Sequence, residues 1–323
     1  MTIVTIQDDA SGMRARIAPL FGFNLFELTL PMADGSGDNC DWELLWAADR
    51  FGDGGQRPSG SGIPILFPFP GRLQNGRFTW NAQTWKLPEN DGRGNAIHGF
   101  VLDRPWRIID SSQQAVTGEF HAHRDAPEIA ALWPSDFRIQ ATYEIVGRTL
   151  TATYRFDNPG ESLLPFGFGI HPYFRLPLAA ASSAGPAAAD SCLVQLPVRS
   201  EWELQSLIAT GNTLPADPRL TQGIRFGELA LDNVFGELDF SAGRCRCAID
   251  DPASRRRIWI DFGCDFRELV VYNPPHREAL CIEPYTCVPG AAHRRKADTD
   301  LGWRCLSPGC AVELQVRIGA ETP

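Results

Sequence analysis

Glycine and proline recur along the whole chain and divide it into short stretches. The 30 glycines and 25 prolines are spread over 323 residues and do not gather in linkers. Between them apolar residues alternate with a period of two, most clearly from Phe137 to Phe156, and long stretches with helical periodicity are scarce. This pattern predicts a mainly β fold built from many short antiparallel strands. With no fixed-period repeat and no evident boundary, we expect a single domain over residues 1–323.

Composition and charge exclude several classes of function. Lysine and arginine total 30 and aspartate and glutamate total 39, so the net charge is −9. An acidic chain is a poor partner for nucleic acid or for an anionic membrane surface. No run of 18 apolar residues is present, and the N-terminus lacks the basic segment and apolar core of a signal peptide. The nine cysteines form no metal-type cluster, so we expect free thiols and a cytoplasmic location.

The segment from Pro165 to Phe174 presents a histidine in an unusual setting. In a strand, Gly167, Gly169 and His171 share one face, so the imidazole lies beside two positions without side chains. Pro172 keeps His171 extended. We interpret this arrangement as a histidine that faces a gap open to a ligand. The alternative is a core histidine before a proline turn, because a lone histidine is weak evidence for catalysis.

A glutamate stands in a comparable position near the C-terminus. Glu283 interrupts an apolar strand, and Pro284 holds it extended as Pro172 holds His171. A dry, unpaired carboxylate costs several kcal/mol, so Glu283 requires a partner or a ligand.

Three further polar residues are candidates for binding. Arg72 ends a proline-rich apolar segment and could present its planar donor group at a cleft, although a surface salt bridge is the alternative. His98 precedes Gly99, which allows backbone to pass close to its ring. Asp232 lies in a short acidic turn, where it could equally be a turn former. His121 and His123 alternate on one predicted strand without a third ligand nearby, so we expect no zinc site there.

An ionised glutamate beside a charged histidine forms a base and acid couple that can move two protons across a small polar substrate. Opening a hemiacetal ring requires this, because one proton leaves the anomeric hydroxyl while another reaches the ring oxygen. We expect Glu283 to be the acidic neighbour that keeps His171 charged. The chain has no nucleotide-binding loop and no nucleophile elbow.

The ordered motifs resemble those of the aldose 1-epimerases, the galactose mutarotase-like proteins. The matching segments run from Gly62 to the C-terminal part of the chain: 62–68 with Arg72, 97–100, 150–158, 169–174, 231–235 and 282–284. The resemblance implies a large twisted antiparallel β-sandwich with few short helices, with Glu283 as general base and His171 as general acid. It further implies that His98 assists at the ring oxygen, that Arg72 and Asp232 hold sugar hydroxyls, and that no metal or organic cofactor takes part.

Two departures from the best-studied members lie where the sugar should bind. Gly71 stands where they carry asparagine, and the segment after His98 is shorter than theirs. Both departures bear on the identity of the sugar more than on the type of reaction. From the resemblance we expect a free hexose such as glucose or galactose as substrate, and a small-molecule sugar as the ligand of a monomer or weak homodimer.

Three alternatives remain open. The first is an epimerase for a hexose 6-phosphate or another acidic sugar, for which Arg57, Arg77 and Arg93 are possible anion-binding residues. The second is a sugar-binding protein without turnover. The third is a glycosidase that uses Glu283 and Asp232 as its two carboxylates.

Overall fold

The computed structural model describes residues 2–33, 39–179, 186–293 and 300–322. Among these residues the fold is dominated by strands, as predicted, and every strand ladder is antiparallel. The α-helices are single turns, at α1 (Ala122–Asp125), α2 (Pro186–Ala189) and α3 (Arg219–Gln222). No helix in the described part of the chain has the length and hydrophobicity that a membrane crossing requires.

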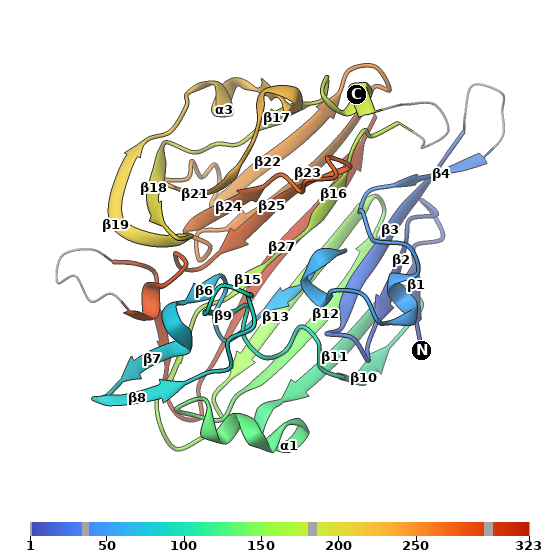
Figure 1. The fold of residues 1–323 in the computed structure, drawn as a ribbon. Coiled ribbons are helices and arrows are strands. Elements are labelled where there is room, and N and C mark those ends of the chain that lie inside the picture. Colours follow the sequence, from blue (N-terminus) through green and yellow to red (C-terminus); the bar gives the residue numbers. More distant parts are fainter. Residues whose placement is uncertain (1, 34–38, 180–185, 294–299, 323) are drawn as a thin grey trace.

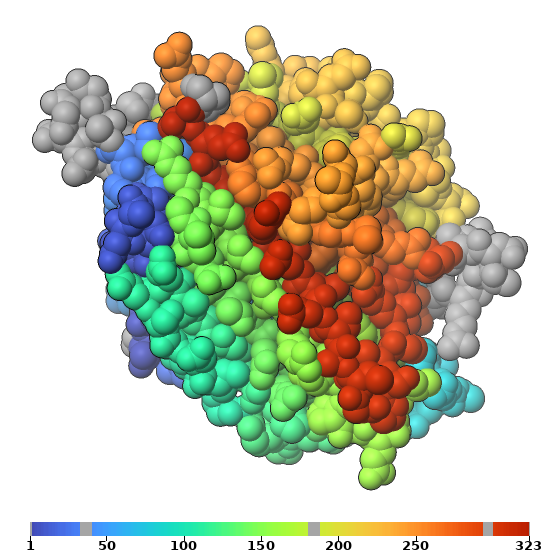
Figure 2. Space-filling view, turned by 180° about the vertical axis from the view of Figure 1, so that it is seen from behind, coloured from blue at the N-terminus to red at the C-terminus, as the bar shows by residue number. Residues whose placement is uncertain are grey.

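A nine-stranded sheet forms the back of the molecule. Figure 2 shows its strands as successive teal, green, red and orange bands, with the C-terminal strand between segments far from it in sequence. In order, the strands are β10 (Arg107–Ser111), β11 (Ala115–His121), β12 (Arg138–Val146), β13 (Thr149–Asp157), β27 (Ala311–Glu321), β23 (Arg256–Gly263), β22 (Arg244–Asp251), β17 (Leu193–Gln195) and β20 (Ile224–Arg225).

An eight-stranded sheet carries the motifs that the sequence singled out. Its order is β19 (Ile208–Pro215), β18 (Ser200–Gln205), β21 (Asp232–Gly236), β24 (Glu268–Tyr272), β25 (Ala279–Tyr285), β15 (Gly169–Ile170) and β5 (Ile65–Leu66), and β16 (Tyr173–Arg175) also pairs with β25. Figure 1 shows β24, β25 and β16 running diagonally across the front.

Smaller sheets complete the fold. A four-stranded sheet joins β1 (Val4–Gln7), β2 (Arg14–Ala18), β3 (Asn24–Ala33) and β4 (Asn39–Glu43), and it lies across the molecule from β18 and β19 in Figure 1. Two-stranded ladders join β6 (Arg72–Leu73) to β9 (Ala96–Ile97), β7 (Arg77–Trp80) to β8 (Gln83–Lys86), and β14 (Leu164–Phe166) to β26 (Arg304–Leu306).

Aromatic rings fill the space between the two large sheets. Phe156 on β13 lies 4.8 Å from Phe67 and 4.7 Å from Phe168, measured between ring centroids. Tyr154 also contacts Phe168, at 4.8 Å. All four side chains are buried. Each ring removes roughly 150–250 Å² from water, so this layer supplies much of the hydrophobic stabilisation between the sheets.

Several local predictions are confirmed and others are wrong. The hairpin over Phe137–Phe156 forms as β12 and β13, with the predicted buried face. The segment 231–235 is not a turn, because Asp232 begins strand β21. His121 and His123 do not share a strand, since His121 ends β11 and His123 lies in α1. Both contact Asp136, at 2.7 and 3.8 Å, a third potential ligand that the sequence pattern did not indicate.

Candidate functional site

A polar pocket lies on the outer face of the eight-stranded sheet. Alternation along β25 explains its position, because Leu280 and Ile282 enter the core while Cys281, Glu283 and Tyr285 point the other way. The cavity measures about 250 Å³, which suits a small polar ligand. The structure brings all five predicted site residues into its lining: Arg72, His98, His171, Asp232 and Glu283.

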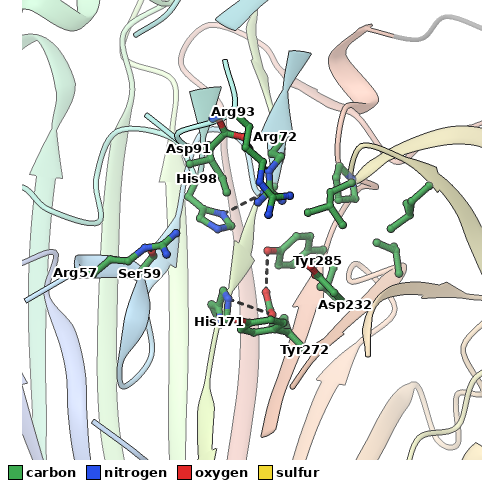
Figure 3. Close-up of a pocket in the computed structure, with 18 of the residues that line it drawn as sticks. Arg57, Ser59, Arg72, Asp91, Arg93, His98, His171, Asp232, Tyr272 and Tyr285 are labelled. Atoms are coloured by element: carbon green, nitrogen blue, oxygen red, sulfur yellow. Dashed lines mark hydrogen bonds and ion pairs between the residues drawn. The ribbon is translucent and has the colours of Figure 1, made fainter. Parts of the chain in front are cut away.

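His171 and Glu283 both line this pocket and contact each other, and Figure 3 draws the contact as a dashed line from His171. His171 lies between β15 and β16, at a break in the strand that the sequence pattern had suggested was continuous. Its Nε2 is 3.2 Å from Oε1 of Glu283, and both side chains are buried. Tyr173 stacks on the imidazole at 4.7 Å with the rings 5° from parallel, which fixes the ring orientation.

The predicted gap beside His171 is filled by protein. A Cβ on Gly169 would lie 2.4 Å from Cδ1 of Tyr285, and one on Gly167 would lie 2.4 Å from Sγ of Cys287. The missing side chains therefore make room for neighbouring residues and not for a ligand, so that part of the interpretation is wrong. Their effect on the site is indirect, because the space at Gly169 admits the Tyr285 ring.

Tyr285 is a site residue that sequence reasoning missed. Its hydroxyl donates a 2.8 Å hydrogen bond to Oε2 of Glu283, inside the protein. Strand alternation could have identified it, because Glu283 and Tyr285 are two residues apart on β25 and therefore share a face. Through this bond and the contact with His171, both carboxylate oxygens have partners.

Burial controls the protonation of the pair. It raises the pKa of Glu283 well above its usual value and lowers that of His171 to about 3, because a site of low polarity disfavours both charged forms. Burial therefore disfavours the charged form of His171 that the sequence led us to expect beside Glu283. In the neutral pair the shared proton lies on Glu283, and in the ion pair it lies on Nε2 of His171. The two forms contain the same number of protons, and transfer of the shared proton across the 3.2 Å contact interconverts them.

His98 lies on the wall above His171, with the ring centroids 5.9 Å apart. Its Nδ1 accepts a 3.3 Å hydrogen bond from the backbone N–H of Gly71, and burial lowers its pKa well below the usual range. A neutral ring that accepts at Nδ1 carries its hydrogen on Nε2. His98 can therefore offer one N–H donor to a ligand.

Arg72 is held by a carboxylate that the sequence pattern did not reveal. Its Nε lies 3.1 Å from Oδ2 of Asp91, whose side chain is 1% exposed. Asp91 also accepts hydrogen bonds from the Asn95 side-chain amide and from the backbone N–H groups of Arg93 and Asn95, and these bonds together with Arg72 lower its pKa to about 2. Asp91 lies in an irregular loop, where no periodicity could identify it.

The departure at Gly71 has a structural reason. Gly71 has a φ of +65°, and a Cβ there would lie 2.7 Å from Cβ of Pro289. A residue with a side chain would have to displace Pro289, which itself lines the pocket. In this chain Pro289 thus occupies the space beside Gly71.

Cys281 adds a thiol to the site. Ligand atoms of His171, Cys281 and Glu283 lie within 4.8 Å of one another, a set that could hold a thiophilic divalent cation. Burial raises the pKa of the Cys281 thiol well above its usual value, which opposes metal binding because the thiolate is the ligand. That no metal takes part in the chemistry stays a prediction.

The sequence profile of the aldose 1-epimerase family matches residues 3–301. A curated relative from Escherichia coli K12, named "Uncharacterized protein YihR", is 24% identical over 245 residues, 70% of each chain. Among solved structures, a galactose mutarotase-like protein from Clostridium acetobutylicum superposes with a TM-score of 0.84 at 22% identity, covering 97% of this chain and 94% of that one. A GalM/aldose epimerase homologue from C. elegans gives a TM-score of 0.79 at 17% identity, covering 99% of each chain. At these identities the two structures establish the shared fold.

Proposed function

The chain belongs to the aldose 1-epimerase family, and from that premise we propose that it interconverts the α and β anomers of a hexose such as glucose or galactose. The observation that carries the proposal is the 3.2 Å contact between His171 and Glu283, which both line a pocket of about 250 Å³. The two residues supply a proton acceptor and a proton donor side by side, which is what ring opening of a hemiacetal requires.

The proposed reaction begins with transfer of the shared proton from Glu283 to His171. The hydrogen bond from Tyr285 and the positive charge of Arg72 favour the carboxylate form of Glu283. Glu283 then accepts the proton of the anomeric hydroxyl while His171 donates a proton to the ring oxygen. The bond between C1 and the ring oxygen breaks and C1 becomes a carbonyl. Rotation about the C1–C2 bond and reclosure, with both proton transfers reversed, yield the other anomer and restore the pair.

The remaining wall residues bind and orient the sugar in this proposal. His98 donates its Nε2 hydrogen toward the ring oxygen, beside His171. Arg72, fixed by Asp91, and Asp232, at the start of β21, hold hydroxyls. Because a ring oxygen can only accept hydrogen bonds, two N–H donors on neighbouring histidines suit it.

Substitution of the proton-transfer pair tests the proposal. Glu283→Gln and His171→Asn should each lower the enzymatic rate of anomerisation at least about 10²-fold, since each removes one proton-transfer group. The assay is polarimetry of freshly dissolved α-D-glucose and α-D-galactose, with the spontaneous rate subtracted. Glu268→Gln is the matched control, because Glu268 is a buried glutamate outside the pocket lining.

The outcomes separate the alternatives. A wild-type rate equal to the spontaneous rate, together with sugar binding that survives Glu283→Gln, would identify a sugar-binding protein without turnover. Release of p-nitrophenol from p-nitrophenyl glycosides would instead identify a glycosidase, since Glu283 and Asp232 both line the pocket. The proposal predicts that the wild-type protein accelerates anomerisation in the polarimetric assay and releases no p-nitrophenol from the glycosides.

A further inference from the structure

Three arginines line the pocket, which is more positive charge than sugar hydroxyls require. They are Arg57, Arg72 and Arg93, in a protein whose net charge is −9. Arg72 already has a carboxylate partner, because its Nε lies 3.1 Å from Oδ2 of Asp91. Over the described residues, Arg57 and Arg93 make no ion pair: Arg57 Nε donates to the hydroxyl of Ser59, and Arg93 contacts Asp91 through its backbone N–H. Among the described residues, these two guanidinium groups thus have no carboxylate partner and can bind a ligand that carries its own negative charge.

Arg57 is held beside the reacting end of the pocket by a chain of contacts. It immediately precedes the 3₁₀ turn Pro58–Gly60, and Pro58 restricts its backbone. The carbonyl of Ser59 in this turn accepts a 2.9 Å hydrogen bond from the hydroxyl of Tyr173. Tyr173 in turn stacks on His171. The turn that carries Arg57 is therefore anchored to the same residue that orients the proposed acid.

The position of Arg57 matches one particular atom of a pyranose. Figure 3 places Arg57 on the side of His171 and His98, away from Asp232. Its charge contributes to lowering the pKa of both histidines, which is consistent with this placement. The histidines face the ring oxygen in the proposed mechanism. The ring carbon bonded to that oxygen on the side away from C1 is C5, which carries the exocyclic C6.

We infer that the substrate is an anionic sugar, with a phosphate, sulfate or carboxylate group at C6 that binds Arg57. This inference rests on the proposed epimerase function and specifies its substrate class. Guanidinium groups recognise all three anions through paired N–H donors. Arg93, whose charge acts on Asp232 at the other wall, adds to the positive field that attracts such a substrate.

Comparison of the rates for neutral and anionic sugars tests the inference. Exchange NMR measures kcat/KM for glucose, galactose, glucose 6-phosphate, glucose 6-sulfate and glucuronate, each corrected for the spontaneous rate. We expect at least one anionic sugar to exceed glucose at least tenfold, with the advantage shrinking as salt is raised. In Arg57→Gln the ratio of anionic to neutral kcat/KM should fall at least tenfold. Arg77→Gln is the matched control, because Arg77 is exposed on β7 and outside the pocket lining, and its ratio should stay within twofold of wild type.

Each result has a defined meaning. Turnover of glucose or galactose that exceeds that of every anionic sugar would overturn the inference and leave the proposed function standing. An unchanged ratio in Arg57→Gln would overturn the assignment of Arg57. Absence of catalysis with all five sugars would overturn the proposed function itself. The relative rates of the phosphate, sulfate and carboxylate arms identify the anion.

Discussion

Replacing Tyr285 with phenylalanine should slow the enzyme by disfavouring the carboxylate form of Glu283. The Tyr285 hydroxyl donates a 2.8 Å hydrogen bond to a buried carboxylate oxygen. A hydrogen bond to a charged group contributes roughly 1.5–3 kcal/mol, and each 1.36 kcal/mol is a factor of ten in an equilibrium. The proton transfer that produces Glu283 carboxylate and charged His171 would therefore become roughly 10- to 150-fold less favourable. The two forms of the pair contain the same number of protons, so the equilibrium between them does not depend on pH. The loss of rate should therefore appear across the whole pH plateau.

The pH profile provides a second readout with a defined sign. The hydrogen bond from Tyr285 lowers the pKa of Glu283, so its removal raises that pKa further. The pair then keeps its last proton to a higher pH, and the alkaline limb of kcat should move upward by about 1–2 pH units. Polarimetry from pH 5 to 9.5, corrected for spontaneous anomerisation, measures the plateau and the limb together. A plateau within twofold of wild type, or a limb that moves to lower pH, would refute this account.

A matched substitution separates this effect from a general loss of a buried hydroxyl. Tyr143 is also buried and does not line the pocket. Tyr143→Phe should leave the plateau and the limb in place even if it alters thermal stability.

Three further substitutions test the supports of the site. Asp91→Asn removes the carboxylate that fixes Arg72. Steady-state kinetics should show a KM about tenfold higher with a smaller change in kcat, and an unchanged KM would contradict the role of Asp91. Gly169→Ala would place a methyl group 2.4 Å from the Tyr285 ring and should lower kcat at least tenfold, which a crystal structure should explain by a displaced ring. Glu268→Gln should stabilise the protein at pH 8 by up to about 3 kcal/mol and much less at pH 5. Burial raises the pKa of Glu268 to about 7, so the folded state holds a proton that the unfolded state releases above about 4.5, and wild-type stability falls as pH rises through that window. Melting temperatures at both pH values check this, and an equal gain at both would exclude the explanation.

Much of the candidate site was predictable because strand alternation is local. Glu283 and His171 were identified from proline-pinned strands and from motif order, and the structure places them in contact. Tyr285 could have been found by the same alternation. The contribution of Asp91 could not, because an irregular loop carries no period that links it to Arg72, 19 residues away.

Charge state was harder to predict than position. From the sequence, Glu283 beside His171 indicates an ion pair, since opposite charges attract. In the folded protein both groups are buried, and the loss of hydration disfavours the charged form of each. Whether a pair is charged depends on how much water reaches it, and this is a property of the surrounding packing.

The sequence by itself determined the β architecture, the family motifs and the two proline-held residues, because these depend on backbone restrictions and on side chains that alternate within single strands. Only the tertiary structure decided what fills the space beside Gly169, and which of Arg57, Arg77 and Arg93 reach the pocket. It places Arg57 and Arg93 in the lining and leaves Arg77 outside. The reason is that such contacts join segments far apart in the chain, and no local pattern constrains how those segments approach one another.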